Sequence, residues 1–320
     1  MLKAGMESPV LLLLAGFIIL GLAGEALLRG AVTLANALRV SPLVIGLTII
    51  AFGTSAPELT VSINAVLDGQ PDISIGNVVG SNIANILLVL GAMAVVSPFF
   101  VNRGTLGRDG GFMFAVSVLF LMLGFYGMID RVIGILLLLG IIGFSIYLYP
   151  SSREAEDTAE AEAGVDENLV PGGPLVALLV LLLGIAGVIG GAELMVDGAV
   201  ALARQWGISE AVIALSLVAI GTSLPELAVS LVAAIRGHAG LAVGNIIGSN
   251  ISNILLILGA TAVVAPLPIS DILAARDIPI MVGVAGLGLV FLASNRGMSR
   301  LEGGISLALY AAYMGFIFSA

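Results

Sequence analysis

Long apolar runs separated by short polar segments dominate the chain. Each run is close to the roughly 20 residues that a helix needs to cross the hydrocarbon layer of a membrane. The alternating period of a lipid-facing β-barrel is absent, so helices are the remaining way to satisfy the backbone inside lipid. We therefore predict an all-α integral membrane protein with ten transmembrane helices, over residues 9–36, 41–67, 72–97, 110–128, 131–149, 174–203, 209–235, 240–265, 276–293 and 300–319.

The same unit occurs twice in the sequence. Adding 168 to a residue number in the first half gives its counterpart, so that Asn85 corresponds to Asn253. Eight of ten positions are identical over 53–62, and thirteen of seventeen over 76–92. With five helices in each half, an odd number, the second copy enters the membrane from the opposite side. Two inverted five-helix repeats are typical of transporters, whose substrate site lies near the midplane where the repeats meet.

A polar stretch separates the two units. The chain is 59% hydrophobic and only 10% charged, against roughly 25% charged in a soluble domain. Its net charge of -9 is concentrated in this stretch, which is too polar to bury. We predict a first repeat over 1–149, an acidic cytoplasmic linker over 150–173 and a second repeat over 174–320. The linker contains seven acidic residues: Glu154, Glu156, Asp157, Glu160, Glu162, Asp166 and Glu167.

The positions of Lys and Arg predict the orientation, because cytoplasmic loops carry an excess of both. If the N-terminus is outside, eight of these residues fall on the inner side and four on the outer side. We therefore expect a protein of the plasma or inner membrane, in contact with the lipid bilayer, with both termini outside. The inner set is Arg29, Arg39, Arg103, Arg108, Arg153, Arg236, Arg296 and Arg300, and the outer set is Lys3, Arg131, Arg204 and Arg276.

Glycine and proline predict where helices pack closely and where they break. The chain has 42 glycines, which suits close approach of helix backbones in lipid; we expect this at Gly76, Gly80, Gly244 and Gly248. Each half also contains Gly-Thr-Ser-x-Pro-Glu-Leu, at 53–59 and at 221–227. The prolines lack an N–H and crowd the preceding turn, so carbonyl oxygens are freed at membrane depth. Such backbone is tolerated there only where it lines a cavity or a binding site.

The polar residues of the two copies gather oxygen atoms on helix faces. Spacings of three and four residues place hydroxyl and carboxylate groups on one face of each broken helix. In the following helix, polar residues at i, i+4 and i+8 form one stripe. These residues are Thr54, Ser55, Glu58, Asn77, Ser81 and Asn85, with Thr222, Ser223, Glu226, Asn245, Ser249 and Asn253 in the second copy.

Oxygen ligands of this kind suit Ca2+ or Na+, whereas copper, zinc and iron prefer nitrogen or sulfur. The chain has no Cys, and its one His, His238, has no counterpart in the other half. An ionised carboxylate in hydrocarbon costs several kcal/mol unless it is neutralised. One divalent cation, two monovalent cations or two protons would neutralise Glu58 and Glu226, and a site that competing ions neutralise in turn is what an exchanger requires.

Structural roles compete with this interpretation. A buried Glu can be a protonated hydrogen-bond donor, and Ser and Asn can join helices; for Asn77, Asn82, Asn245 and Asn250 this role is as well supported as ion binding. For Glu25 and Glu193 we favour a structural role, because Arg29 and Asp197 lie at i+4 near helix ends. His238 is interpreted as a loop residue.

The two Gly-Thr-Ser-x-Pro-Glu-Leu motifs, each followed by Gly-Asn-x-x-Gly-Ser-Asn-Ile-x-Asn, resemble the repeats of the Ca2+/cation antiporter superfamily, in particular its Na+/Ca2+ exchanger branch. The resemblance implies ion sites on the second, third, seventh and eighth helices, and a first and sixth helix that slide as a pair across a rigid bundle. Ca2+ and Na+ are then transported substrates, with no cofactor, enzymatic activity or nucleic-acid partner. The implied ligands are Glu58, Glu226, Thr54, Ser55, Thr222, Ser223, the carbonyls of Ala51 and Ala219, Ser81, Ser249, Asn85 and Asn253.

Position 253 varies within the superfamily that the motifs resemble. K+-dependent relatives and some prokaryotic exchangers carry Asp there, whereas both copies here have Asn, so no K+ requirement is expected. Exchange of Ca2+ for H+ is the alternative function, although relatives with that activity usually carry Gly-Asn-x-x-Glu where this chain has Gly-Thr-Ser-x-Pro-Glu. An ion channel would need a continuous wetted path, and a single His cannot form the HExxH site of a zinc hydrolase.

Overall fold

A computed structural model describes residues 8–101, 104, 106–159, 169–207, 219–294 and 296–319. Several sequence predictions therefore concern residues outside the described part, namely Lys3, Arg103, Glu160, Glu162, Asp166, Glu167 and the first part, 209–218, of the seventh apolar run.

Helices make up nearly all of the described structure. In the first half they are α1 (Pro9–Leu38), α2 (Pro42–Ile45), η2 (Gly46–Ile50), α3 (Ala51–Thr54), α4 (Ala56–Leu67), α5 (Pro71–Ala84), η3 (Asn85–Leu90), α6 (Gly91–Val96), η4 (Leu106–Gly110), α8 (Gly111–Tyr126) and α9 (Arg131–Ala159). In the second half they are α10 (Gly173–Gln205), α12 (Ala219–Thr222), α13 (Leu224–Ile235), α14 (Ala239–Ser252), η6 (Asn253–Leu258), α15 (Gly259–Val264), η7 (Leu273–Asp277), α16 (Ile278–Ser294) and α17 (Arg300–Ser319).

Seven helices of the described part are long and apolar enough to span a membrane, and the pair Pro42–Thr54 with Ala56–Leu67 makes eight if it counts as one bent span. The prediction of an all-helical integral membrane protein is confirmed at this level. Two antiparallel strand pairs join loops of the two halves: β1 (Phe99–Phe100) with β4 (Gly297–Met298), and β2 (Met128–Ile129) with β3 (Leu267–Pro268).

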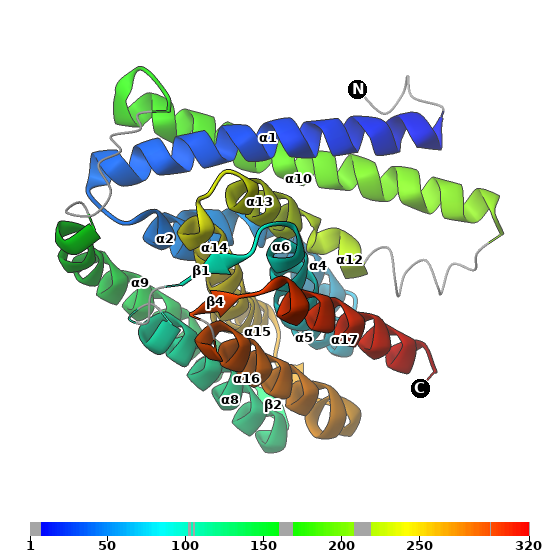
Figure 1. Ribbon diagram of the computed structural model, residues 1–320. Helices are drawn as coiled ribbons and strands as arrows, with labels where there is room; N and C mark the ends of the chain where they lie inside the picture. Colours follow the sequence, from blue (N-terminus) through cyan, green and yellow to red (C-terminus); the bar gives the residue numbers. More distant parts are fainter. Residues whose placement is uncertain are drawn as a thin grey trace.

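The buried core is formed by two continuous helical rods, one from each half. The first rod is 71–96 (α5, η3 and α6), and 78% of the residues in its most apolar part are buried. The second rod is 239–264 (α14, η6 and α15), where the corresponding value is 83%. The corresponding value is 22% in α1. Figure 1 shows α1 and α10 running side by side across one face of the molecule, with α8 and α16 on the opposite side of the central helices.

Glycines allow α1 and α10 to approach closely along their length. A Cβ at Gly30 would lie 2.6 Å from the Leu181 nitrogen, and one at Gly184 would lie 2.6 Å from the Leu27 nitrogen. Positions early in α1 contact positions late in α10, since a Cβ at Gly16 would meet the Gly191 carbonyl oxygen. The two helices are therefore antiparallel, and the close packing expected from the glycine content is confirmed here.

A second close crossing joins α2 and η2 to α14. A Cβ at Gly244 would lie 2.5 Å from the Leu43 carbonyl oxygen, and a Cβ at Gly248 would lie 2.5 Å from that of Leu47. The prediction of close packing is confirmed for these two glycines. For Gly76 and Gly80 no atom of the described residues lies within 4 Å of an added Cβ, and the residues related by the repeat to Leu43 and Leu47 lie outside the described part.

π-helical turns repeat between the halves, both in the two rods and in the segments that follow them. η3 begins at Asn85 and η6 begins at Asn253, and η4 and η7 contain the repeated Arg-Asp pairs. π-helical turns are rare and occur frequently at functional sites. Here they place both candidate asparagine ligands at a change of helical geometry.

The boundary between the halves differs in detail from the sequence interpretation. Helix α9 continues to Ala159 and thus covers the first ten residues of the predicted linker, while α10 begins at Gly173. The predicted ranges 1–149, 150–173 and 174–320 remain predictions.

Candidate functional site

The second predicted span and its repeat counterpart both break at the Thr-Ser-x-Pro sequence. α3 ends at Thr54 and α4 begins at Ala56, with Ser55 between them at φ -82° and ψ 6°. The equivalent Ser223 has φ -88° and ψ 2°. In the first half, the two parts of the span are bent by 42°. The breaks predicted from the prolines are therefore confirmed, with each proline in the first turn of a new helix, where its missing N–H costs little.

Glu58 and Glu226 lie in the first turns of α4 and α13, and each is only 1% exposed. A helix N-terminus stabilises negative charge. The two carboxylates are close enough to repel each other electrostatically. None of the helices α4, α5, α13 and α14 contains a Lys or Arg, so these four helices supply no positive charge to balance them.

Each carboxylate contacts a hydroxyl group from the opposite half of the chain, and Glu226 also contacts Ser249 of its own half. Ser55 Oγ donates a hydrogen bond of 3.3 Å to Glu226 Oε1, and Ser249 Oγ lies 3.5 Å from the same oxygen. The Thr222 side chain hydrogen-bonds the Glu58 carboxylate, as its repeat counterpart Thr54 does the Glu226 carboxylate. The hydroxyl of Ser223, the counterpart of Ser55, has no partner among the described residues. The broken helices of the two repeats thus face each other across the carboxylates.

Asparagines connect these broken helices to the central rods. Asn77 Nδ2 donates to Ser62 Oγ at 3.0 Å and to the Glu58 carbonyl at 3.1 Å, and Asn245 Nδ2 donates to Ser230 Oγ at 3.2 Å. The roles of Ser62 and Ser230 were missed in the sequence, although both lie four residues after a glutamate in the repeated patch, on the same helix face.

Thr54 links the two halves of the structure. Its hydroxyl lies 3.1 Å from the Ile50 carbonyl oxygen and 3.3 Å from Asn245 Oδ1, and it can donate to one of them at a time. The Ala51 carbonyl accepts the Ser55 N–H at 3.1 Å, and the Thr54 hydroxyl lies 3.4 Å from the same oxygen. When Thr54 donates elsewhere, this carbonyl keeps a second lone pair. Ala219 is the first residue of α12.

Several buried oxygens at this place have no hydrogen-bond partner among the described residues. A buried acceptor without a partner costs about 1–3 kcal/mol, so a bound cation would satisfy a real deficit. Around these atoms, Ser81 and Ser249 are also buried, at 3% and 0% exposure. The atoms without a partner are Glu58 Oε2, Glu226 Oε2, Ser223 Oγ, Asn85 Oδ1 and Asn253 Oδ1.

The donor set is dominated by neutral oxygens. Within the described residues, no group of three or more His, Cys, Asp or Glu side chains could hold a metal ion. Two carboxylates with hydroxyl and amide oxygens are suited to a hard cation such as Ca2+ or Na+. They do not resemble the nitrogen and sulfur sites of transition metals.

A cavity of about 480 Å³ lies beside the site, between α4, α10 and the start of α13. Its lining includes Pro57, Pro225 and Thr222, and from α10 the acidic residues Glu193 and Asp197. Since Thr222 also contacts the Glu58 carboxylate, the cavity is separated from that carboxylate by one residue. Glu193, which we assigned a structural role from the sequence, lines this cavity.

Comparison with known proteins agrees with this chemistry. The family model described as "Sodium/calcium exchanger protein" matches residues 8–149 and 176–319, which is most of the chain. The chain belongs to the sodium/calcium exchanger family. As a member of this transporter family, it is similar to the sodium/calcium exchanger MaX1 of Methanosarcina acetivorans, with 32% identity over 96% of this chain and 98% of that protein.

Two further proteins are similar to this chain over most of its length. The inner membrane protein YrbG of Escherichia coli is 38% identical over 86% of this chain and 85% of its own length. A solved structure of the sodium-calcium exchanger NCX_Mj, soaked with Na+ and Ca2+, superimposes with a TM-score of 0.82 and 32% identity, covering 96% of this chain and 97% of the other. The family resemblance inferred from the two motifs is confirmed.

Proposed function

We propose that this protein exchanges Na+ for Ca2+ across the membrane by alternating access, with both ions bound in turn between the repeats. The observation that carries the proposal is the pair Glu58 and Glu226. Both carboxylates are buried, each has an oxygen without a hydrogen-bond partner among the described residues, and the four helices around them contain no Lys or Arg. Two such charges require neutralisation by ions.

The proposed ligands combine the carboxylates with neutral oxygens from both halves. Ca2+ takes about six to eight oxygen ligands, which two carboxylates alone cannot supply. Backbone carbonyls at helix breaks are typical Na+ ligands in transporters. The proposed set is Glu58, Glu226, Thr54, Ser55, Thr222, Ser223, the carbonyls of Ala51 and Ala219, Ser81, Ser249, Asn85 and Asn253.

We further propose ten spans in two inverted repeats, with both termini outside and the acidic linker in the cytoplasm. The correspondence of elements at an offset of 168 supports this, because η3 and η6, and likewise η4 and η7, begin near equivalent positions. The antiparallel pair α1 and α10 also agrees with it, since these helices occupy equivalent places in the two repeats.

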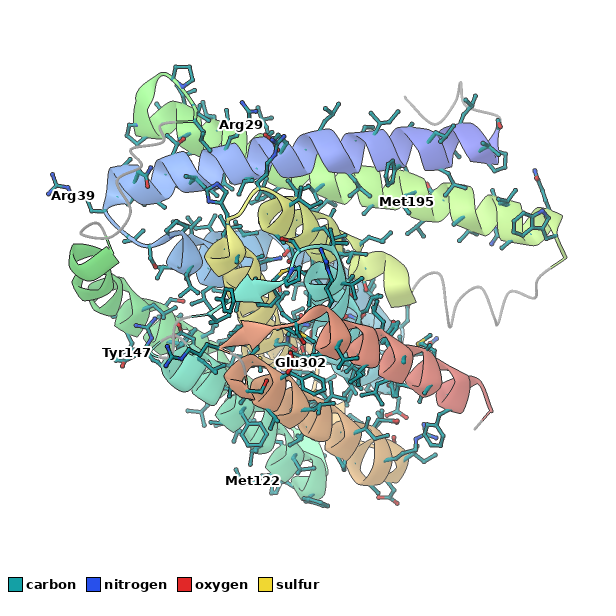
Figure 2. The ribbon with its side chains drawn as sticks, viewed as in Figure 1. Arg29, Arg39, Met122, Tyr147, Met195 and Glu302 are labelled. Atoms are coloured by element: carbon teal, nitrogen blue, oxygen red, sulfur yellow. The ribbon has the colours of Figure 1, made fainter. Side chains whose placement is uncertain are left out.

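The pair α1 and α10 is the proposed moving element. On one side, Glu25 of α1 accepts from Arg236, just after α13, at 2.8 Å, and from Arg29 at 2.9 Å. Arg29 lies on α1 and Arg39 lies at its end (Figure 2). On the other side, α10 borders the cavity next to Thr222. In this conformation one ion pair links α1 to the end of α13, and a cavity lies beside α10 at the start of α13.

Breaking the ion pair should lower exposure of the cavity. In Arg236→Gln, α1 loses its charged link to α13, so we expect the population with the open cavity to fall. The Arg236 side chain is 56% exposed, and exposed ion pairs contribute about 0–1 kcal/mol. The population with the open cavity should therefore change by up to about fivefold. The chain has no Cys, so the maleimide labelling rate of Thr60→Cys, in the cavity lining, reports the change. Arg39→Gln is the control, and equal rates in both backgrounds would contradict the coupling.

Uptake into proteoliposomes tests the transport function itself. We expect 45Ca2+ uptake into vesicles preloaded with Na+, and no uptake into vesicles preloaded with choline at the same pH. Uptake driven by an imposed pH gradient without Na+ would instead identify Ca2+/H+ exchange, with the two glutamates as proton carriers. Flux that persists without any counter-ion would contradict an exchanger and indicate a channel.

A further inference from the structure

Asn82 joins the two central rods at a contact between repeat-related residues. Its Nδ2 lies 3.4 Å from the carbonyl oxygen of Asn250, its own counterpart in the second half, and 3.5 Å from Met281 Sδ. Its Oδ1 accepts a 2.9 Å hydrogen bond from Asn253 Nδ2. Asn82 is 3% exposed and Asn253 is 1% exposed, so water does not compete for these bonds.

The orientation of both amides follows from one fixed acceptor. A backbone carbonyl can only accept, so the side of Asn82 that faces Asn250 must be its NH2 group. Its Oδ1 then faces Asn253, which must present its own NH2 group in return. Asn253 Oδ1 therefore points away from Asn82, and it is buried without a partner among the described residues.

We propose that Asn82 is a positioning residue that holds Asn253 with its carbonyl oxygen directed into the ion site and its NH2 group turned away. The inference rests on the proposed function, in which position 253 binds a transported ion. Two carboxylates balance the charge of one Ca2+, so an additional ion, or one of lower charge such as Na+, depends more on neutral oxygens. An Asn that rotated by half a turn would present N–H donors to Na+ and repel it.

The equivalent residue of the other half does not have this role. Asn250 Nδ2 donates at 2.7 Å to the carbonyl of Ile246 in its own helix. Asn250 is also 3% exposed, so it offers a matched site with the same residue type, burial and repeat position. The two identical motifs therefore differ in function at this position.

The proposal also explains why an amide suits position 253 in this chain. A carboxylate there would place an acceptor 2.9 Å from Asn82 Oδ1, which is an acceptor too. A proton would have to lie between them, or Asn82 would have to rotate and lose the Asn250 carbonyl. With Asn82 in place, Asn253→Asp should therefore make Na+ binding depend on pH.

The test is the Na+ dependence of 45Ca2+ exchange in reconstituted Asn82→Leu. Leu has the same number of side-chain heavy atoms and the same branching as Asn, and its apolar groups are tolerable beside Met281. We expect the half-saturating Na+ concentration to rise about tenfold, the loss expected for one neutral ligand to a charged group, with little change in the maximal rate. Asn250→Leu, the control, should leave the half-saturating Na+ concentration within about threefold, since the side-chain hydrogen bond of Asn250 among the described residues is to its own helix.

A double variant separates positioning from loss of structure. In Asn82→Leu with Asn253→Asp, either carboxylate oxygen can face the ion, so orientation no longer matters. We expect Na+ affinity to recover, with a weaker pH dependence between pH 6 and pH 8 than in Asn253→Asp alone. A purely structural role for Asn82 would predict a double variant at least as impaired as Asn82→Leu.

The outcomes distinguish the two proposals. If Asn253→Ala leaves Na+ dependence unchanged, position 253 is not a ligand and the site assignment fails. If Asn253→Ala weakens Na+ binding but Asn82→Leu and Asn250→Leu behave alike, the site stands and the positioning role of Asn82 is wrong.

Discussion

Glu226→Gln is expected to abolish Ca2+ uptake while leaving a folded protein. Gln has nearly the same shape as Glu, so Ser55 and Ser249 keep a partner, but the site loses one of its two negative charges. Removing one partner of a buried charge interaction costs about 3–5 kcal/mol, and 1.4 kcal/mol is a factor of ten. We therefore expect apparent Ca2+ affinity to fall at least a hundredfold in Glu226→Gln, and likewise in Glu58→Gln.

Initial rates of 45Ca2+ uptake over a range of Ca2+ concentrations measure this loss, with size-exclusion chromatography and thermal unfolding as measures of folding. Glu302→Gln is the matched control, because it removes a carboxylate that caps α17 through the Ser299 N–H at 2.8 Å. It should retain uptake within about twofold, because Ser294 and Ser299, which donate hydrogen bonds to Glu302, are not among the proposed ion ligands. Wild-type flux in either site variant would show that Glu58 and Glu226 are not the ion ligands.

The sequence predicted the local structure of the candidate site because the two copies of the unit constrain each other. A proline beside a glutamate in an apolar run has few stable arrangements, and its repetition at the same offset shows that both copies use the same one. The breaks at Ser55 and Ser223 have nearly the same backbone angles. Local rules for proline were sufficient to predict them.

Contacts between the halves could not be predicted in the same way. Ser55 reaches Glu226, and Asn253 reaches Asn82, each across 171 positions. Such pairs depend on how the two copies dock, which many small packing contacts determine together. The π-helical turns that begin at Asn85 and Asn253 are equally unpredictable, since Asn-Ile-Leu-Leu has no local signal for them.

Identical motifs can also acquire different bonds, as Asn82 and Asn250 show. Asn82 bonds across the interface between repeats, whereas Asn250 bonds to its own helix. The proposed alternating access would make each state of the protein asymmetric, which agrees with different hydrogen bonds at repeat-related positions. Sequence repetition therefore predicts which residues form the site and not how each is oriented.

Gly248→Ala is expected to destabilise the protein strongly, although it adds only one methyl group. The new Cβ would lie 2.5 Å from the Leu47 carbonyl oxygen, 2.7 Å from Leu47 Cα and 2.8 Å from Ala51 Cβ. Two of these atoms are backbone, so relief requires η2 and α14 to move apart, and overpacking of this kind costs about 1–3 kcal/mol or more. Ser249 and the Ala51 carbonyl lie at the same crossing, so Ca2+ uptake should fall together with thermal stability.

The same substitution at an exposed glycine is expected to maintain or raise the stability instead of lowering it. Gly21 in α1 is exposed, and no atom of the described residues lies within 4 Å of an added Cβ. Ala is favoured over Gly in a helix by about 1 kcal/mol, so Gly21→Ala should keep or slightly raise the unfolding temperature. Thermal unfolding of both variants in one detergent, followed by 45Ca2+ uptake, makes the comparison. Equal stability of the two variants would mean that the crossing of η2 and α14 has room for a side chain. The close approach beside Ser249 would then not determine the distance between the repeats at the proposed ion site.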